Sequence, residues 1–479
     1  MLCPLRWGKV ITMGRTSKSG TGTVFVCQQC GKMSLKWLGR CPNCQQWNTF
    51  VETKSAVTAA SAPASLLNPP QELSRIVINA RDRFPLPLAE FNRVLGGGVV
   101  SGSLTLIGGD PGIGKSTLLL QAAALVAREQ GSVVYVSGEE TPHQIKLRSE
   151  RLGVKGDNLY LLAETDLEAI LNQIDEMSPI LVVIDSIQTV SLSELEASPG
   201  SITQVRECTL RLMRWAKQST APVFVAGHVT KDGNIAGPRV LEHIVDVVLY
   251  LEGEPFSAYR LLRCVKNRFG STNEVGIFEM KSEGLLEVAD PSQVFLSRRL
   301  SQRVGSVVVP TIEGSRPLLV EIQALTNPTS FGLPRRTANG VDFGRLLLVA
   351  AVLSRRVGLK LGNQDIITNV TGGLKVGEPS ADLGVALAIA SSYRDVEVAP
   401  GLVAVGEVGL SGELRAVSQL ERRVGEAARL GFKRCLVPET GCKVSVKDKD
   451  IELVPAATLK EALGLGLVRG RTKDKSGED

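Results

Sequence analysis

Long hydrophobic runs and aromatic residues are both scarce in this chain. No apolar run approaches the roughly 18 residues that a membrane-spanning helix needs, so we expect no membrane span. The first residues also lack the continuous apolar stretch of a signal peptide, and the sequence therefore predicts a cytoplasmic protein. Aromatic residues make up 4% of the chain, whereas glycine occurs 48 times, which favours an α/β architecture with many tight turns.

Cysteine is also sparse, and most of it is scattered. Four of the nine cysteines, at positions 27, 30, 41 and 44, lie close together, while the other five show no pairing pattern. In a cytosolic protein, clustered cysteines bind metal far more often than they form disulfides. The cluster therefore predicts a metal site.

Charge is unevenly distributed along the chain. The net charge is +6, yet residues 1–54 alone hold eight Lys or Arg residues against one acid, Glu52. A small basic module suits a polyanionic partner, but a basic solubilising tail has the same composition. Charge alone leaves both interpretations open.

The length and the composition predict several domains. A chain of 479 residues is too long for one ordinary domain and suggests roughly three. Residues 55–72 are rich in Ala, Ser and Pro, as linkers are. The expected segments are a disordered tail (1–26), a four-cysteine zinc finger (27–54), a linker (55–72), an α/β domain (73–285), a less regular domain (286–465) and a disordered tail (466–479).

Short apolar runs alternate with helical stretches between residues 73 and 285. Runs such as 103–109 and 180–186 are apolar almost throughout, and helix-forming segments such as 115–129 separate them. Apolar strands that are separated by helices indicate a mainly parallel sheet covered on both faces. Beyond residue 286 the alternation is less regular.

A phosphate-binding loop is the strongest motif in the chain. Residues 109–116 read GDPGIGKS, a complete G-x-x-x-x-G-K-S that follows an apolar strand and opens a helix. The glycines let successive backbone N–H groups point at phosphate, and the helix adds its positive dipole end. Lys115 is expected to reach the β- and γ-phosphates, and the Ser116 hydroxyl to bind Mg²⁺. The expected nucleotide-binding set is Gly109, Asp110, Pro111, Gly112, Ile113, Gly114, Lys115, Ser116 and Thr117.

ATP hydrolysis requires two further groups beside that loop. The apolar strand ILVVID ends at Asp185, which is expected to anchor the Mg²⁺. A group that orients or deprotonates the attacking water is expected from the end of SVVYVSGEE, which offers Glu139 and Glu140. We predict Glu139, because two adjacent side chains cannot both point at the γ-phosphate. Alternatively, both are solvated carboxylates that cap the next helix.

Two C-x-x-C pairs separated by ten residues predict a structural zinc site. Each pair turns two thiolates toward one point, and two pairs complete a tetrahedral site. The expected ligands are Cys27, Cys30, Cys41 and Cys44. The alternative, a thioredoxin-type redox pair, needs a single C-x-x-C on a βαβ frame.

Aromatic and basic residues are interleaved in the same module. Trp37 and Trp47 lie among Lys32, Lys36 and Arg40, a pattern that suits stacking on and neutralising single-stranded nucleic acid. We favour the other interpretation for the tryptophans, in which they form the small core of a zinc ribbon. The basic residues remain available to DNA in either case.

With these motifs in place, the sequence resembles the RadA/Sms family of bacterial DNA repair ATPases over residues 24–465. The resemblance rests on VFVCQQCG and KWLGRCPNC, RVLGGGVVSGSLTLIGGDPGIGKSTLL, GHVTKDGNIAGPRVLEHIVDVVLYLEGE, and KNRFG at 266–270. It implies an N-terminal zinc ribbon (27–54), a RecA-like P-loop ATPase core related to DnaB-type ring helicases (73–285) and a C-terminal Lon-protease-like α+β domain (286–465).

The resemblance implies roles for three more residues. Lys266 and Arg268 of KNRFG match the position from which such rings project basic groups into a neighbour's nucleotide site. A cation there offsets the charge that develops on the transferred phosphoryl group. Contact with DNA and surface ion pairs are the alternatives. His228 stands where related ATPases sense the γ-phosphate, although an ordinary strand-end histidine fits the same position.

The Lon-like part is expected to lack peptidase activity. Proteases of that group activate a serine with a lysine, and Ser380 in GEPSADLG is the counterpart of the serine. Aligning residues 406–423 with the protease segment places Glu421 where the lysine should stand, and a carboxylate cannot replace a neutral amine. The domain is expected to support ring assembly or DNA binding. Its basic candidates for DNA contact are Arg335, Arg336, Arg355 and Arg356.

Together these features predict a DNA-dependent, helicase-like ATPase of DNA repair and homologous recombination. The resemblance implies a homohexameric ring that moves on single-stranded DNA and processes or branch-migrates recombination intermediates. It also implies single-stranded and branched DNA and the RecA recombinase as partners, with ATP, Mg²⁺ and Zn²⁺ as cofactors. Two alternatives stay open: a Lon-like protease, opposed by Glu421, and a KaiC-like nucleotide switch, opposed by the cysteine module and KNRFG.

Overall fold

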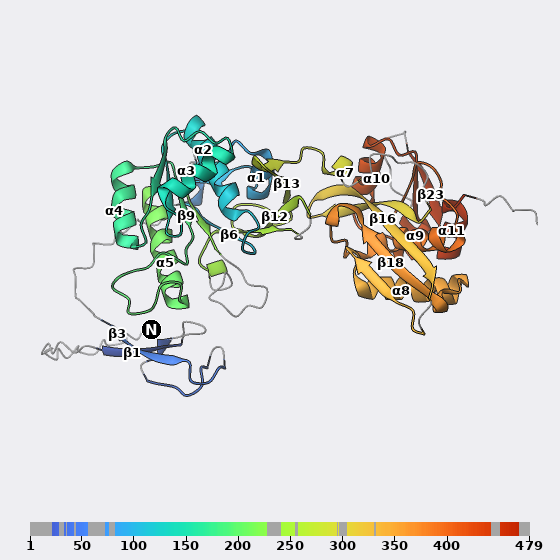
Figure 1. Cartoon of the computed structure of the whole chain (residues 1–479), viewed down its shortest axis with the longest axis horizontal. Coiled ribbons are helices and arrows are strands. Elements are labelled where there is room, and N and C mark those ends of the chain that lie inside the picture. Colours follow the sequence, from blue (N-terminus) through green and yellow to red (C-terminus); the bar gives the residue numbers. More distant parts are fainter. Residues whose placement is uncertain are drawn as a thin grey trace, which may run out of the picture.

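Two large bodies and a small sheet make up the described part of the chain (Figure 1). The computed structural model describes residues 22–27, 33–34, 36–42, 45–55, 72–75, 82–227, 241–253, 257–294, 296, 304–329, 332–441 and 451–468. Among these residues, no helix combines the length and the apolar character that crossing a bilayer requires. The two bodies are built on a nine-stranded and a seven-stranded sheet.

The small sheet contains the cysteine module. Its antiparallel strands lie in the order β2-β1-β3. They are β1 (Gly22–Cys27), β2 (Met33–Ser34) and β3 (Phe50–Ser55). Cys27, Cys41 and Phe50 form its buried cluster.

The tryptophans do not form the core of this module, contrary to our prediction. Trp37 is 53% exposed and Trp47 is 67% exposed. The centre of so small a sheet is filled by Phe50 and the two thiols, so the indole rings lie on its surface. Trp37 Nε1 donates to the Phe50 carbonyl at 3.2 Å, and the Arg40 guanidinium lies 5.6 Å from the Trp47 ring centre.

The nine-stranded sheet has the order β14-β13-β12-β11-β6-β10-β9-β7-β8. Its strands are β6 (Leu104–Gly108), β7 (Val133–Ser137), β8 (Leu159–Leu162), β9 (Leu181–Asp185), β10 (Val223–Ala226), β11 (Val247–Glu252), β12 (Tyr259–Asn267), β13 (Val275–Lys281) and β14 (Gly284–Glu287). The six strands from β11 to β8 in this order are parallel, as predicted. Strands β12, β13 and β14 extend the sheet as antiparallel hairpins.

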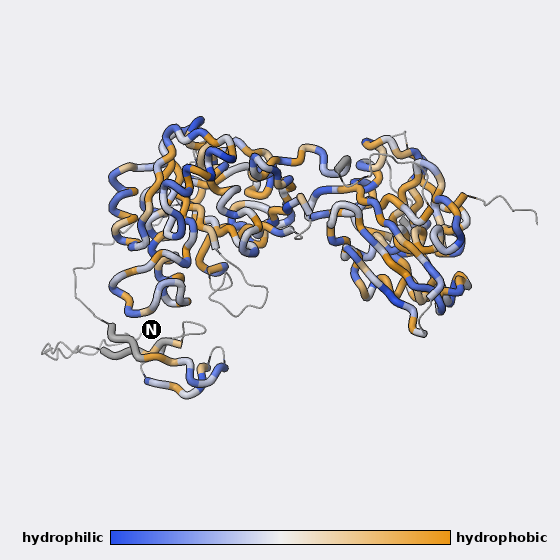
Figure 2. The backbone as a smooth tube through the Cα atoms, in the orientation of Figure 1, coloured by the Kyte–Doolittle hydropathy of each residue, from blue (hydrophilic) through white to orange (hydrophobic). Residues whose placement is uncertain are grey.

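Helices cover both faces of this sheet. They are α1 (Ala89–Leu95), α2 (Lys115–Glu129), α3 (Pro142–Arg151), α4 (Leu167–Met177) and α5 (Ile202–Ser219), and a two-stranded ribbon, β4 (Arg83–Phe84) and β5 (Val99–Val100), lies beside them. Residues of α1, α2 and α3 share one apolar cluster with the sheet, and residues of α4 and α5 share another. Neighbouring residues of one strand, such as Val134 and Tyr135, belong to opposite clusters, because side chains alternate between the faces. Figure 2 shows the hydrophobic residues following the central strands.

The C-terminal body is a mixed sheet in the order β17-β18-β16-β15-β19-β22-β23. Its strands are β15 (Ser306–Glu313), β16 (Arg316–Pro328), β17 (Arg336–Asn339), β18 (Gln364–Val370), β19 (Leu402–Ala404), β22 (Arg434–Pro438) and β23 (Glu452–Ala456), with a separate ribbon of β20 (Glu407–Val408) and β21 (Leu414–Arg415). Its helices are α7 (Pro291–Val294), α8 (Phe343–Val352), α9 (Asp382–Arg394), α10 (Leu420–Arg429) and α11 (Leu459–Gly466). Helices α8, α9 and α11 share the large apolar cluster, and α10 packs in the second cluster on the other face.

The turn between β15 and β16 joins the two bodies. Arg316 and Glu90 of α1 form an ion pair at 2.7 Å, and both side chains are largely buried. Arg263 of β12 pairs with Glu313 at 2.8 Å. The turn needs a glycine at Gly314, because its φ is +65° and a Cβ would collide with the backbone of the neighbouring body. Oppositely charged side chains of the two bodies thus pair across this junction.

Candidate functional site

The phosphate-binding loop lies between β6 and α2, at the carboxyl edge of the parallel strands. Two of its glycines have positive φ and close neighbours, and at Gly109 the neighbour is a backbone atom that cannot give way. A Cβ on Gly109 would lie 2.5 Å from the Leu251 carbonyl oxygen, and a Cβ on Gly114 would lie 2.7 Å from Met280 Cε. The strand, loop and helix therefore have the context that the motif requires.

Lys115 is the first residue of α2 and is buried. Its Nζ donates to the carbonyls of Gly109 and Asp110, at 2.8 Å and 3.0 Å. Burial lowers the pKa of Lys115, although nearby carboxylates, those of Asp185 and Glu139 among them, oppose the shift. The structure therefore brings this lysine together with both predicted carboxylates.

Asp185 ends β9 and is only 8% exposed. The hydroxyl of Tyr135, from the neighbouring strand β7, donates a hydrogen bond to its carboxylate. Burial, reinforced by the negative charge of Asp185, raises the pKa of Tyr135 well above its ordinary value, so the phenol stays protonated as a donor. Sequence reasoning missed Tyr135, because inside the run SVVYVS it has the pattern of a core residue.

The two glutamates after β7 point to different partners. Glu139 accepts a hydrogen bond from the Ser186 hydroxyl at 2.6 Å, next to Asp185. Glu140 instead forms an ion pair with Arg148 of α3 at 2.6 Å. Neither glutamate is the N-cap of α3, because Thr141 occupies that position in a capping box. Glu139 is therefore the glutamate beside the phosphate-binding loop.

Lys266 and Arg268 lie far from the phosphate-binding loop of their own chain. Strand β12 is antiparallel to β11, so it begins at the edge that holds the loop and brings Lys266, its penultimate residue, to the opposite edge. Lys266 Nζ donates to the carbonyls of Glu242 and Val245, and Arg268 pairs with the buried Asp246 at 3.0 Å. Burial, together with the charge of Arg268, lowers the pKa of Lys266. One chain alone does not bring these cations to its nucleotide site.

Half of the predicted zinc ligands fall within the described residues. Cys27 and Cys41, one from each C-x-x-C pair, are almost fully buried in the same small cluster. That placement fits a site in which both pairs share one metal. Cys30 and Cys44 lie outside the described residues, as does His228. Within the described ranges, therefore, no group of three or more potential ligands occurs.

Arg423, not Glu421, lies beside Ser380, which corrects our prediction. Arg423 Nη1 donates to Ser380 Oγ at 3.0 Å, and Arg423 Nη2 pairs with Glu378 at 2.6 Å. Glu421 is exposed on the other side of α10. A guanidinium stays protonated at all working pH values, so it cannot act as the general base that a lysine provides.

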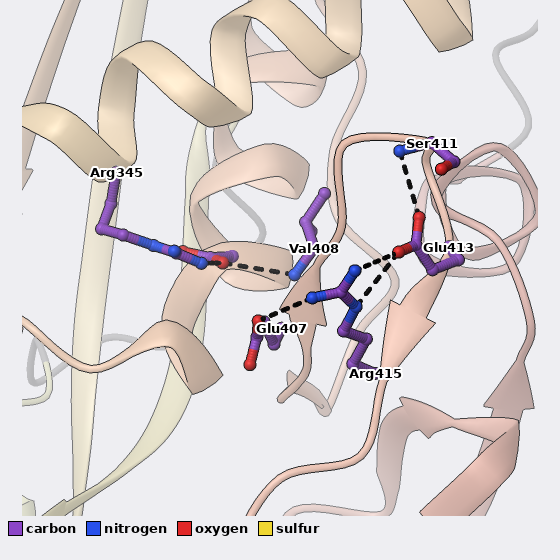
Figure 3. Close-up of polar contacts among 7 residues, drawn as sticks. Arg345, Glu407, Val408, Ser411, Glu413 and Arg415 are labelled. Carbon is purple, nitrogen blue, oxygen red and sulfur yellow. Dashed lines mark hydrogen bonds and ion pairs between the residues drawn. The ribbon is translucent and has the colours of Figure 1, made fainter.

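Other arginines of the C-terminal body are held in polar contacts (Figure 3). Arg345 pairs with the buried Asp382, and Arg415 bridges Glu407 and Glu413 beside the loop that contains Ser411. The predicted DNA-contact candidates differ from one another. The guanidinium of Arg336 binds backbone carbonyls. Arg335, Arg355 and Arg356 are exposed, and Arg356 Nε donates to the Leu410 carbonyl at 3.2 Å.

The fold and the site define a RecA-like P-loop ATPase core between a zinc ribbon and a Lon-like domain. The family model of the AAA domain matches residues 69–234, and that of the rubredoxin metal binding domain matches residues 25–52. The model of subunit ChlI of Mg-chelatase matches residues 332–441.

The chain belongs to the RadA family of DNA repair proteins. It is 53% identical to the DNA repair protein RadA of Halalkalibacterium halodurans, over 93% of this chain and 99% of that protein. It is 52% identical to RadA of Bacillus subtilis, with the same two coverages, and 52% identical to RadA of Listeria monocytogenes, over 93% and 98%. A KaiC-like protein from Pyrococcus horikoshii, 21% identical, matches 43% of this chain and 98% of its own with a TM-score of 0.37.

Proposed function

We propose that this protein is a DNA-dependent ATPase that forms a ring and moves on single-stranded DNA during repair and homologous recombination. Its task would be to process or branch-migrate recombination intermediates in the cytoplasm. Single-stranded and branched DNA would be its substrates, the RecA recombinase a partner, and the assembly a homohexamer. Membership of a family of DNA repair proteins supports the cellular role.

The observation that carries the ring proposal is the separation of the two halves of the catalytic machinery. The phosphate-binding loop lies at one edge of the sheet, and Lys266 and Arg268 lie at the opposite edge. If these cations serve a nucleotide, that nucleotide belongs to a neighbouring subunit. A cation supplied in trans couples hydrolysis to subunit contacts.

The remaining residues would act within one chain. The nucleotide would lie on residues 109–117, with Lys115 on its terminal phosphates and Ser116 and Asp185 holding Mg²⁺, which neutralises phosphate charge. Glu139 would orient the attacking water, and its bond from Ser186 fixes the carboxylate. Cys27, Cys30, Cys41 and Cys44 would hold a structural Zn²⁺.

The proposal is tested by the rate of ATP hydrolysis with and without single-stranded DNA. We expect stimulation of about tenfold or more, because a motor hydrolyses ATP productively only on its track. Lys115→Ala should remove both the basal and the stimulated rate, whereas Arg128→Ala, an exposed change at the far end of α2, should leave both unchanged. A protein that hydrolyses ATP at the same rate with and without polynucleotide would contradict the proposal.

A further inference from the structure

The sheet order fixes the direction in which a nucleotide leaves the phosphate-binding loop. Strand β6 precedes the loop, and β9 and β7, which end near Asp185 and Glu139, both lie on one side of it. The γ-phosphate must face that side, because hydrolysis takes place there. The nucleoside end must therefore point to the other side, where β11, β12, β13 and β14 lie.

Arg260 of β12 lies against the loop on that side. Its Nε donates to the carbonyl of Ile113 at 3.2 Å, and its Nη1 donates to the carbonyls of Ser257 and Tyr259. All these acceptors are neutral, and no carboxylate among the described residues forms an ion pair with this guanidinium. Within the described part of the chain, the guanidinium thus contacts neutral carbonyls beside the loop.

Gly253 makes room for this arginine. A Cβ at that position would lie 2.6 Å from Arg260 Cδ and 3.0 Å from the Tyr259 carbonyl oxygen. Any other residue at position 253 would push the guanidinium away from the loop. The end of β11 and the start of β12 are therefore shaped together to hold Arg260 in this place.

Met280 of β13 forms a second wall beside the loop. A Cβ on Gly114, the residue that precedes Lys115, would lie 2.7 Å from Met280 Cε, so a side chain there would displace the thioether. The hairpin that carries Met280 is fixed to α2, because the Gln121 side chain accepts from the Leu285 N–H at 3.0 Å. Arg260 of β12 and Met280 of β13 thus flank two consecutive residues of the loop, and β14, which follows β13, is anchored to the helix that the loop opens.

We propose that Arg260 and Met280 form the nucleoside site, with the guanidinium stacked on the purine ring and the thioether packed against it. A guanidinium is planar and stacks well on aromatic faces, and a thioether sulfur is polarizable and adaptable. Neither group reads the hydrogen-bonding edge of a base, so the site contributes affinity for the ring itself. This inference rests on the proposed function, because it completes the nucleotide site on residues 109–117.

The test compares two ligands that differ by the nucleoside. A non-hydrolysable ATP analogue would contact both the phosphate-binding loop and the nucleoside site, whereas inorganic tripolyphosphate would contact only the loop. For Arg260→Ala we expect about tenfold weaker binding of the analogue and a change below about twofold for tripolyphosphate. Arg260→Lys, which keeps the charge and loses the planar group, should weaken the analogue almost as much.

Two controls separate the possible failures. Lys115→Ala should weaken both ligands, and Arg128→Ala should weaken neither. An equal loss of both ligands in Arg260→Ala would overturn the inference, because it would show that Arg260 only shapes the loop through Ile113. Unchanged binding of both would also overturn it. If the unaltered protein bound neither ligand, the proposed ATPase function itself would fail.

Discussion

Arg423 is the buried residue that contacts Ser380. Its side chain is 1% exposed, and it contacts both the serine hydroxyl and the Glu378 carboxylate. The Glu378 carboxylate also accepts from the Thr311 hydroxyl at 2.6 Å. Lon-type proteases activate the serine with a lysine, whereas the group beside Ser380 here is a guanidinium that also binds Glu378.

From these contacts of Arg423 we predict an effect on the stability of the C-terminal body. Arg423→Met should destabilise the C-terminal body by about 3 kcal/mol, because it leaves the Glu378 charge poorly compensated. Arg422→Met, an exposed change at the preceding position of α10, should cost less than about 0.5 kcal/mol. Urea unfolding followed by circular dichroism measures both. Equal effects of the two substitutions would contradict the role that we assign to the buried pair.

The Arg423–Glu378 pair also predicts how the difference in stability between the wild-type protein and Arg423→Met depends on pH. Burial alone would raise the pKa of Glu378, but hydrogen bonds from Arg423, Thr311 and Ser380 hold it below its ordinary value of 4.5. A carboxylate with a lowered pKa stabilises the fold above its unfolded pKa, and this contribution is lost as the pH falls through the folded pKa. The difference in the free energy of unfolding between the wild-type protein and Arg423→Met should therefore be largest near pH 7 and decrease below about pH 4.5.

Single residues also show where sequence reasoning reaches its limit. The phosphate-binding loop and Asp185 could be placed from the sequence, because each follows a recognisable apolar strand. The residue beside Ser380 could not be placed in this way. Residues two apart on a helix point in nearly opposite directions, so an alignment error of two residues selected Glu421 on the wrong face. Arg423 is the buried one of the two.

Among the elements, β12 reaches from one edge of the sheet to the other. Near its start Arg260 contacts the phosphate-binding loop, and near its end Lys266 donates to the carbonyls of Glu242 and Val245. The apolar pattern predicted this strand but not its direction. The short connection 253–258 was the available signal, because it is too short for the crossover that a parallel pair needs.

The zinc ribbon gives a prediction at the scale of one element. Cys27→Ser should reduce the zinc content from about one per chain to well below one, because a structural site needs all four thiolates. Cys3→Ser, outside the cluster, should keep the zinc. A metal assay after extensive dialysis measures both variants. A wild-type protein that holds no zinc would contradict the proposed site.

At the scale of the whole molecule, the C-terminal body is docked close to the nucleotide site. A cavity of about 400 Å³ is lined by Gly109 and Asp110 of the loop and by Lys375 of the C-terminal body. The Ser257 hydroxyl donates to the Gly372 carbonyl at 3.2 Å beside it. The motifs predicted the separate parts of the chain, but this junction could not be predicted, because its contacts join residues far apart in the sequence, such as Ser257 and Gly372, and follow no motif.

The central claim is that ATP hydrolysis drives movement along DNA, and strand displacement from a forked DNA substrate tests it most directly. We expect the wild-type protein to release the strand only with ATP, Glu139→Gln to release none, and Glu140→Gln, whose partner is Arg148, to retain most of the rate. Release that proceeds equally without ATP, or that survives Glu139→Gln at the wild-type rate, would contradict the account.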